Sequence, residues 1–380
     1  MKIPLSSPDI AESDIEAVVS VLRTSRLSLG PKLREFEELM AEYIGVPHCV
    51  ALSSGTAGLH LGLQALGIGE GDQVILPSFT FIAAANSVLY QRATPVFVDI
   101  DPLTLNLDPG AVEQAITPRT KAIMAVHTFG RPADLGSLLD IAQKHGLRLI
   151  EDGCEAIGAE YRGRKVGGFG DFGVFSFYPN KPITTGEGGV LITRDAGLAA
   201  NIRALRNQGR RDQDDWLEHS ILGYNYRIPE INCALGIAQL KRIDSILARR
   251  ESLAHRYAQE LQSVPDVTTP LLNIEQGRLC WFAFVARFSS RFTQADRDWI
   301  LRDMAARGIG CRQYFPPIHR QPLYSAYATG HPNLTVTEHV SARTLALPFF
   351  NHLTEDQISE VCRNLRESMA SAAKHKKDFH

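Results

Sequence analysis

Short apolar runs alternate with longer amphipathic stretches between about residues 49 and 193. The short runs have the length of strands and are apolar almost throughout, as buried parallel strands are. The predicted strands cover residues 49–52, 74–76, 96–98, 122–126, 147–150, 174–177 and 190–193. Helical patterns separate the first five of them, at residues 56–66, 82–90, 109–116 and 135–145. We expect an α/β layer with a mainly parallel sheet covered on both faces, and one antiparallel or irregular edge where the last two strands follow closely.

The pattern changes after about residue 228. A long helical pattern there is followed, beyond Pro265 and Pro270, by a strand-like stretch and two more helical patterns. These elements cover residues 229–263 (helix), 281–288 (strand), 295–307 (helix) and 356–369 (helix). We expect a large domain, residues 1–248, and a smaller C-terminal α+β domain, residues 249–380, joined by the long helix.

Composition and charge exclude several classes of protein. The 380 residues carry 40 basic and 42 acidic side chains, so the net charge of −2 gives no field that would attract nucleic acid. The six cysteines form no Cys-x-x-Cys or zinc-finger spacing, and we expect no metal site. No apolar leader or membrane-length apolar stretch occurs, so we expect a cytoplasmic protein with reduced thiols.

The segment FSFYPNKPITTGEGG, residues 175–189, follows a predicted strand and contains an unusual lysine. Lys181 lies between Pro179 and Pro182, which restrict the backbone on both sides and keep it out of a helix. Most lysines lie on solvated helix faces, whereas this one is held on a rigid segment at a strand end. It is a candidate nucleophile for Schiff-base chemistry, and a solvated loop lysine is the equally weighted alternative.

Two more segments place polar groups just after predicted strands. SSGTAGLHL, residues 53–61, combines a candidate N-cap, Ser54, with exposed amides at the start of a helix, which suits a phosphate. A simple capped helix is the alternative. Asp152, in LRLIEDGCEA, follows another strand, where α/β sheets bind ligands. Its carboxylate could cap the next helix or pair with a protonated ring nitrogen.

PSFTFIAAAN, residues 77–86, follows a fourth strand and places an aromatic ring, Phe79 or Phe81, near the same edge. Packing in the core is the alternative for either ring. A phosphate cradle, an aromatic ring, an aspartate and a lysine together are the groups that pyridoxal 5′-phosphate (PLP) requires. The four segments together predict a PLP site, although each is weak alone.

The motifs SSGTAGLH, EDGCEAIGA, SFYPNKPITTGEGG and GYNYRIPEINCALGIAQL occur in this order, and with them nearly the whole chain resembles the DegT/DnrJ/EryC1/StrS family of sugar aminotransferases. The resemblance implies PLP fold type I, the aspartate aminotransferase-like architecture. It implies that Lys181 is the Schiff-base lysine and moves the proton during transfer. Asp152 would pair with the pyridine nitrogen, and Phe81 would stack on the ring.

The resemblance also divides the phosphate site between two subunits. Gly55, Thr56 and Ser176 of one subunit would hold the phosphate, and Asn225 of the other subunit would reach it. Glu155 falls where the family places a polar residue near the cofactor's O3′. An obligate homodimer with shared active sites follows from the Asn225 assignment.

The substrate assignments rest on the same resemblance. RQYFPPIHRQPLY is similar to a family loop near the sugar, which makes Tyr314 and His319 candidates, and RLSLGP, residues 26–31, is similar to a loop at the substrate entrance, which adds Ser28. Packing of an ordinary proline-rich loop is the alternative for Tyr314 and His319. Because Lys181 is a lysine, transamination is expected rather than the dehydration of relatives that have histidine there.

The PNKPITTGEGG version of the lysine motif is similar to the branch that aminates GDP-4-keto-6-deoxy-mannose, with L-glutamate as the expected donor. Transamination of another nucleotide-linked 3- or 4-ketosugar, or of a keto-cyclitol, is the alternative. A non-catalytic regulator or sensor is a more distant one, against which the intact lysine, aspartate and serine count.

Overall fold

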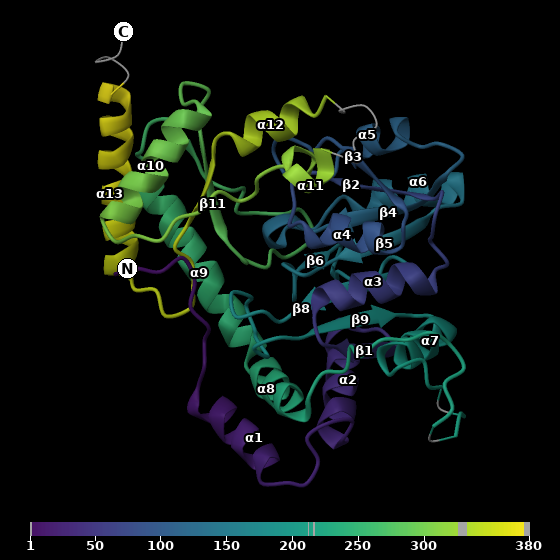
Figure 1. The fold of residues 1–380 in the computed structure, drawn as a ribbon. Coiled ribbons are helices and arrows are strands. Elements are labelled where there is room, and N and C mark those ends of the chain that lie inside the picture. The colour runs from purple at the N-terminus through teal and green to yellow at the C-terminus, as the bar shows by residue number, and fades with distance from the viewer. Residues whose placement is uncertain (1, 212, 216, 326–332, 376–380) are drawn as a thin grey trace.

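The computed structural model describes residues 2–211, 213–215, 217–325 and 333–375. Its large domain is built on a seven-stranded sheet with the strand order β1-β9-β8-β5-β4-β2-β3 (Figure 1). The strands are β1 (His48–Leu52), β2 (Gln73–Pro77), β3 (Thr94–Val98), β4 (Thr120–Val126), β5 (Arg148–Asp152), β8 (Phe172–Ser176) and β9 (Gly189–Thr193). Strand β9 is antiparallel to both neighbours, and the pairs from β3 to β8 are parallel. The predicted parallel sheet is confirmed, and its antiparallel strand lies one strand in from an edge.

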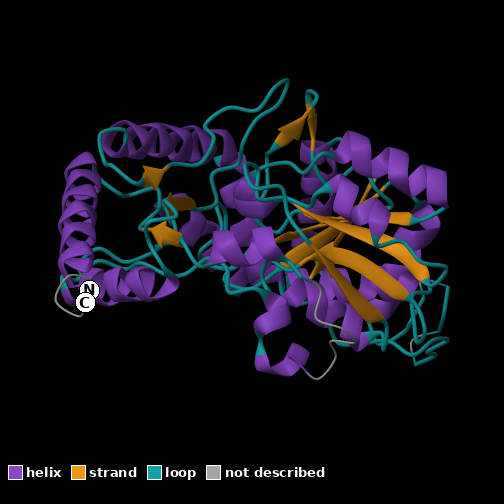
Figure 2. Ribbon diagram, turned by 90° about the horizontal axis from the view of Figure 1, so that it is seen from above, coloured by secondary structure: helices purple, strands orange, loops and turns teal. Residues whose placement is uncertain are grey.

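Helices cover both faces of this sheet, as Figure 2 shows from above. The helices along residues 12–206 are α1 (Glu12–Leu22), α2 (Pro31–Ile44), α3 (Gly55–Ala65), α4 (Ala83–Tyr90), α5 (Pro109–Gln114), α6 (Leu135–His145) and α7 (Ala196–Arg206), of which α1 lies away from the sheet. Successive residues of a strand alternate between two cores: in β4, Ile123 faces one and Met124 faces the other. With both faces buried, the carboxyl ends of the parallel strands form the open edge of the sheet.

The small domain contains a three-stranded antiparallel sheet and long helices that enclose a core of their own (Figure 2). Its elements are β10 (Val267–Thr268), β11 (Phe284–Phe288), α10 (Gln294–Ala306), α12 (Thr335–Ser341), β12 (Thr344–Leu347) and α13 (Glu355–His375). Ile3 packs in this core. The N-terminal segment therefore crosses to the small domain, and the division at residue 248 stays a prediction.

The single long helix predicted for residues 229–263 is wrong. The structure has two helices, α8 (Glu230–Lys241) and α9 (Ile243–Leu261), separated at Arg242. The backbone of Arg242 leaves the helical region (φ −106°, ψ 4°), and its guanidinium pairs with Asp14 of α1 at 2.8 Å. A tertiary ion pair thus accompanies a bend that apolar spacing could not reveal.

Several elements were not predicted from the pattern: α1 and α2 before the alternating region, α7 after it, and the strands β10 and β12. The structure also has a short hairpin, β6 (Glu160–Tyr161) and β7 (Arg164–Lys165), and short helices at Thr128–Gly130, Ile318–Arg320 and Pro322–Ser325. In the described part of the chain, no helix is long and apolar enough to span a membrane. The same residues contain no cluster of three or more side chains suited to holding a metal ion.

Candidate active site

Three of the predicted segments meet where β1, β5 and β8 end. Leu52 of β1 and Ser176 of β8 both pair with Gly189 of β9, so these two strands run in the same direction and end together. A Cβ on Gly189 would lie 2.5 Å from the backbone nitrogen of Gly55. Glycine at this position therefore lets the start of α3 approach the strand ends.

The start of α3 forms a narrow cradle. The predicted N-cap is confirmed, because the Ser54 hydroxyl accepts a hydrogen bond from the Ala57 N–H at 3.1 Å. First-turn N–H groups, which include those of Gly55 and Thr56, have no acceptor within the helix. A Cβ on Gly55 would lie 2.8 Å from the Cys154 sulfur and 2.9 Å from the Ser176 Cβ. Gly55 and Ser176 therefore lie close together at the start of α3, beside N–H donors that suit a phosphate.

Asp152 is the last residue of β5, and its side chain is almost completely buried. One carboxylate oxygen accepts a hydrogen bond from the Cys154 N–H at 3.1 Å. Asp152 belongs to no ion pair among the residues that the structure describes. A buried carboxylate without a cation favours a ligand that brings a positive charge, and a protonated pyridine nitrogen provides one. The residue fits the role predicted for it.

Lys181 lies close to Glu155. The Lys181 Nζ is 3.9 Å from a carboxylate oxygen of Glu155, and both side chains are mostly buried. The other carboxylate oxygen accepts the Phe129 N–H at 2.8 Å. Burial raises the pKa of Glu155 to about 7, although the Lys181 ammonium and the Phe129 hydrogen bond act in the opposite direction. A carboxyl group with this pKa changes its protonation state near neutral pH, which suits acid–base chemistry.

Aromatic rings form one wall beside this pair. The Lys181 Nζ lies 4.1 Å from the centre of the Phe282 ring, and the Tyr314 ring is nearly parallel to that of Phe282, at 6.3 Å. The Phe129 ring is nearly parallel to that of Tyr314 as well, also at 6.3 Å. Burial, and then the charge of Glu155, raise the pKa of the Tyr314 hydroxyl. The structure thus places the predicted residue Tyr314 beside Lys181 and Glu155.

The other predicted residues lie elsewhere. Phe81 is 61% exposed after β2. Asn225 and Ser28 are exposed as well, in segments that pack on β1 and α8 rather than on Lys181. His319 is buried, and its two ring nitrogens contact the Ser78 hydroxyl at 2.7 Å and Glu338 at 3.0 Å. Both nitrogens therefore have protein partners, which fits the packing alternative better than a substrate contact.

Sequence reasoning missed Phe129, Phe282 and Asn180. Phe129 follows β4, so it could have been found by the rule that identified the other segments, namely its position just after a buried strand. Phe282 comes from the small domain, and its carbonyl accepts the buried Arg250 guanidinium at 2.9 Å. Asn180 hydrogen-bonds the Tyr314 hydroxyl, and its buried side-chain oxygen has no partner among the described residues. Neither contact has a signal in the local sequence.

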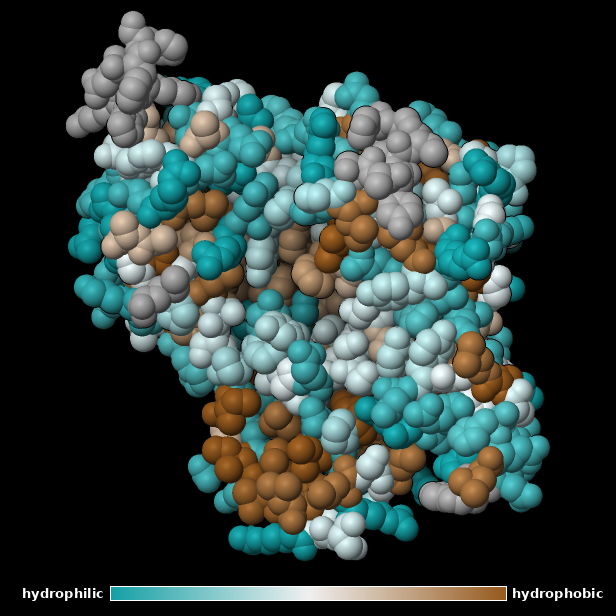
Figure 3. Space-filling model, in the orientation of Figure 1, coloured by the Kyte–Doolittle hydropathy of each residue, from teal (hydrophilic) through white to brown (hydrophobic). Residues whose placement is uncertain are grey.

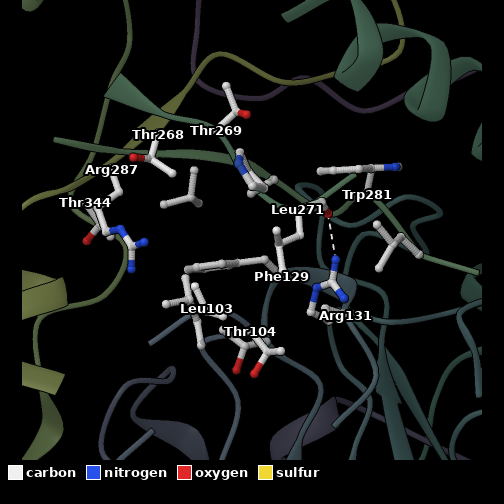
Figure 4. Close-up of a pocket in the computed structure, with 16 residues that line it drawn as sticks. Leu103, Thr104, Phe129, Arg131, Thr268, Thr269, Leu271, Trp281, Arg287 and Thr344 are labelled. Atoms are coloured by element: carbon white, nitrogen blue, oxygen red, sulfur yellow. Dashed lines mark hydrogen bonds between the residues drawn. The ribbon is translucent and has the colours of Figure 1, made fainter. Parts of the chain in front are cut away.

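A hollow lies between the two domains, and Phe129 is one of the residues that line it (Figure 4). Arg131 of the large domain donates hydrogen bonds to the Leu271 and Asn273 carbonyls at 2.7 and 2.9 Å, and Arg287 of β11 donates to the Pro102 carbonyl at 2.5 Å. Lys181 is not among the residues that line this hollow. These links hold the domains together around Phe129, whose N–H binds Glu155.

Comparison with known proteins agrees with this arrangement. The model of the DegT/DnrJ/EryC1/StrS aminotransferase family matches residues 8–366. The chain is 43% identical to a GDP-perosamine synthase of Caulobacter vibrioides over 362 residues, which is 95% of this chain and 96% of that protein. Among solved structures, Helicobacter pylori PseC, an aminotransferase of pseudoaminic acid biosynthesis, is 30% identical, with a TM-score of 0.92 over 98% of this chain and all of that one.

The PLP-form of the putative sugar aminotransferase Spr1654 from Streptococcus pneumoniae is 26% identical, with a TM-score of 0.93 over 98% of this chain and 100% of that one. These matches cover the cradle, Asp152 and Lys181, and they extend over both domains. The chain is therefore a member of the DegT/DnrJ/EryC1/StrS aminotransferase family, an enzyme of sugar biosynthesis with fold type I and PLP as its cofactor.

Proposed function

We propose that the enzyme transfers the amino group of L-glutamate to GDP-4-keto-6-deoxy-mannose and so forms GDP-perosamine. The observation that carries the proposal is the buried Lys181–Glu155 pair beside Asp152 and the α3 cradle. This set of groups supports transamination in general. The choice of sugar rests on the PNKPITTGEGG motif and on the 43% identity with a GDP-perosamine synthase.

The chain's own residues divide the work. PLP, when bound, supplies the aldehyde that receives the amino group and a ring that withdraws electrons. The N–H groups at the start of α3, together with Ser176, would hold its phosphate, and Asp152 would keep the ring nitrogen protonated. Lys181 carries the proton between the reacting carbons, and Glu155 stays within reach of its ammonium. The Phe282 ring and the small domain keep bulk water away from Lys181.

A homodimer with shared active sites belongs to the same proposal. Exposed apolar side chains gather on α1 and on the chain on either side of it: Ile10, Ile15, Leu22, Leu27 and Leu29. Figure 3 shows an apolar area at the lower end of the molecule, where α1 lies in Figure 1. An exposed patch of this kind is typical of a subunit interface. A second copy of the chain is the occupant that the family's shared phosphate site requires.

We place the protein in the cytoplasm. All six cysteines are free thiols, five of them buried, which suits a reducing compartment. Nucleotide-linked sugars and glutamate are polar metabolites, so the proposed substrates fit the same assignment.

A spectrum with added PLP tests the cofactor and the donor. We expect a visible band from the lysine-bound cofactor that collapses to the near ultraviolet when L-glutamate is added. Lys181→Ala is the matched control and should lack that response. A band that L-glutamate leaves unchanged, while another amino acid collapses it, would exclude glutamate as the donor.

A panel of acceptors tests the sugar. The enzyme, converted with glutamate, is mixed with GDP-4-keto-6-deoxy-mannose, with dTDP- and UDP-linked 3- and 4-ketosugars, and with scyllo-inosose. We expect the GDP-linked sugar to restore the visible band with the highest kcat/KM. Faster recovery with another ketosugar or with the cyclitol would replace the proposed substrate and leave the aminotransferase assignment unchanged.

A further inference from the structure

The start of α2 is capped in an unusual way. Helices α3, α5, α6 and α7 are each capped by the side chain of the residue just before them, which is a serine or an aspartate. The residue before α2 is Gly30, which has no side chain to offer. The Glu230 carboxylate, from a segment 197 and 198 residues further along, accepts the N–H groups of Lys32 at 2.8 Å and Leu33 at 2.9 Å. A distant residue therefore does what a local one does elsewhere.

Glu230 and Pro229 also hold the loop between α1 and α2, which we define as residues 24–30. The Glu230 N–H donates to the Leu27 carbonyl at 3.0 Å, and the backbones of Ser28 and Pro229 form an antiparallel bridge. A Cβ on Gly30 would lie 2.5 Å from a Glu230 carboxylate oxygen, so the absence of a side chain at residue 30 makes room for the carboxylate. Pro229 and Glu230 therefore hold the backbone of the 24–30 loop, and the Glu230 carboxylate also holds the start of α2 that follows it.

This clamp has a cost that a local cap avoids. Glu230 is only 1% exposed, and it forms no ion pair among the residues that the structure describes. Burying a carboxylate without a cation is expensive even when it accepts two hydrogen bonds. A serine or aspartate at residue 30 would cap α2 at a lower desolvation cost. It would not connect α2 and the 24–30 loop to Pro229 and Glu230.

The 24–30 loop and the segment that carries Asn225 both face outward. Ser28 and Asn225 are exposed, and Leu27 and Leu29 are 50% and 39% exposed. Figure 1 shows the loop and α1 at the lower end of the molecule, away from the small domain. In a single chain these residues make no contact with Lys181 or Glu155 in the described structure. Their exposed side chains are therefore available to the active site of another copy.

We propose that Glu230 is a positioning residue for the partner's active site: it fixes the 24–30 loop of one subunit over the substrate entrance of the other. This inference rests on the shared active site of the proposed function. Loss of the Glu230 contacts should therefore weaken ketosugar binding in the neighbouring subunit, and not in the subunit that carries the substitution.

Hybrid dimers with one working lysine test this directly. Two differently tagged chains are produced together, and only mixed dimers are purified. In the first arrangement, a chain with both Lys181→Ala and Glu230→Gln is paired with an unchanged chain. In the second, the two substitutions are on opposite chains. Both dimers have the same composition and one working Lys181, so a general loss of folding affects them equally.

We expect the first arrangement to raise the KM for GDP-4-keto-6-deoxy-mannose, or for the better substrate from the panel, by about tenfold with little change in kcat, because glutamine can accept only one of the two N–H groups. The second arrangement should keep the KM of a dimer with only Lys181→Ala in one chain. Gly30→Ala, whose Cβ displaces the carboxylate without removing its charge, should reproduce the effect. Glu35→Gln, which removes a half-exposed glutamate from the same helix, should not.

Asn225→Ala in the same two arrangements keeps the outcomes distinct. If Asn225→Ala and Glu230→Gln both act only across the interface, the inference holds. If Asn225→Ala acts across the interface but Glu230→Gln raises KM equally in both arrangements, or in neither, Glu230 is only a helix cap and the inference fails. If Asn225→Ala itself shows no difference between arrangements, the shared site of the proposed function fails.

Discussion

The surroundings of Lys181 and the face formed by α1, the 24–30 loop and the segment around Asn225 are built in opposite ways. Around Lys181, side chains from the sheet edge and the small domain bury one another and hold the Lys181–Glu155 pair in place. On the outer face, leucines and isoleucines remain exposed, and the polar residues Ser28 and Asn225 point to solvent.

The difference separates what one chain can complete from what it cannot. Asp152, Lys181 and Glu155 already have their relative positions in a single subunit, because β5 and β8, which end at or just before them, are packed on both sides. Glu230 fixes the 24–30 loop of the outer face, although the exposed residues of that face make no contact with Lys181 or Glu155 of the same chain in the described structure. In the proposed dimer a second copy covers this face, and the two regions should respond differently to substitution.

The largest effect is expected from Lys181→Ala. The alanine variant loses both the attachment point of the cofactor and the group that moves the proton, so turnover should fall by at least about a thousandfold. Folding and dimerisation should be unchanged, because the outer face is untouched. Steady-state kinetics with Lys144→Ala, an exposed lysine on α6, as control measures the effect. Turnover within tenfold of the unchanged enzyme would remove Lys181 from the mechanism.

Leu22→Asp is the corresponding change on the outer face. Leu22 is 57% exposed in one chain, so a single subunit should tolerate aspartate, whereas a charge buried between subunits should weaken the dimer by about a hundredfold. Sedimentation equilibrium measures the dissociation constant. Leu103→Asp, at a leucine that is 65% exposed beside the interdomain hollow, is the control and should leave the dimer intact. An unchanged dissociation constant for Leu22→Asp would move the interface away from α1.

Gly55→Ala tests the cradle with a single methyl group. Its Cβ would lie 2.8 Å from the Cys154 sulfur and 2.9 Å from the Ser176 Cβ, so the start of α3 must shift. PLP affinity should fall roughly tenfold, with little loss of stability, because the displaced atoms border the open edge. Fluorescence titration with PLP measures it, and Gly69→Ala, where a Cβ would meet nothing within 4 Å, is the control. Equal affinity for both variants would place the phosphate elsewhere.

These predictions also mark how far the sequence alone could lead. The periodic strands and the residues that directly follow them were predictable, because a parallel sheet brings its strand ends to one edge whatever the rest of the chain does. Gly55, Asp152 and Lys181 belong to this group.

Contacts between distant segments were not predictable in the same way. Phe282 is carried to Lys181 by the small domain, and Glu230 reaches the start of α2 from almost 200 residues away. The break at Arg242 depends on an ion pair with Asp14. Each of these is decided by tertiary packing, which leaves no local period in the sequence. His319 shows the converse, since the resemblance suggested a substrate contact and the structure gives both ring nitrogens protein partners.

Glu155→Gln is expected to have the smallest effect. The sign of its effect on stability shows whether burial or attraction to Lys181 dominates at Glu155. Burial raises the pKa of Glu155 from 4.5 to about 7 in the folded chain. Below pH 4.5 the carboxyl is protonated in both states and contributes no difference in stability. As the pH rises toward 7, the unfolded chain ionises while the folded one keeps its proton, so the unchanged protein loses stability over this window. Glutamine never ionises and keeps an acceptor for the Phe129 N–H.

The Glu155→Gln variant should therefore gain stability relative to the unchanged protein between pH 5 and pH 8, by about 1 kcal/mol once water in the open site screens the penalty. Urea unfolding of the cofactor-free proteins at the two pH values measures the gain, with Glu38→Gln on α2 as the exposed comparison. A variant that instead loses stability as the pH rises would show that attraction to Lys181 outweighs burial. Glu155 would then be ionised beside the ammonium and could not supply a proton near neutral pH.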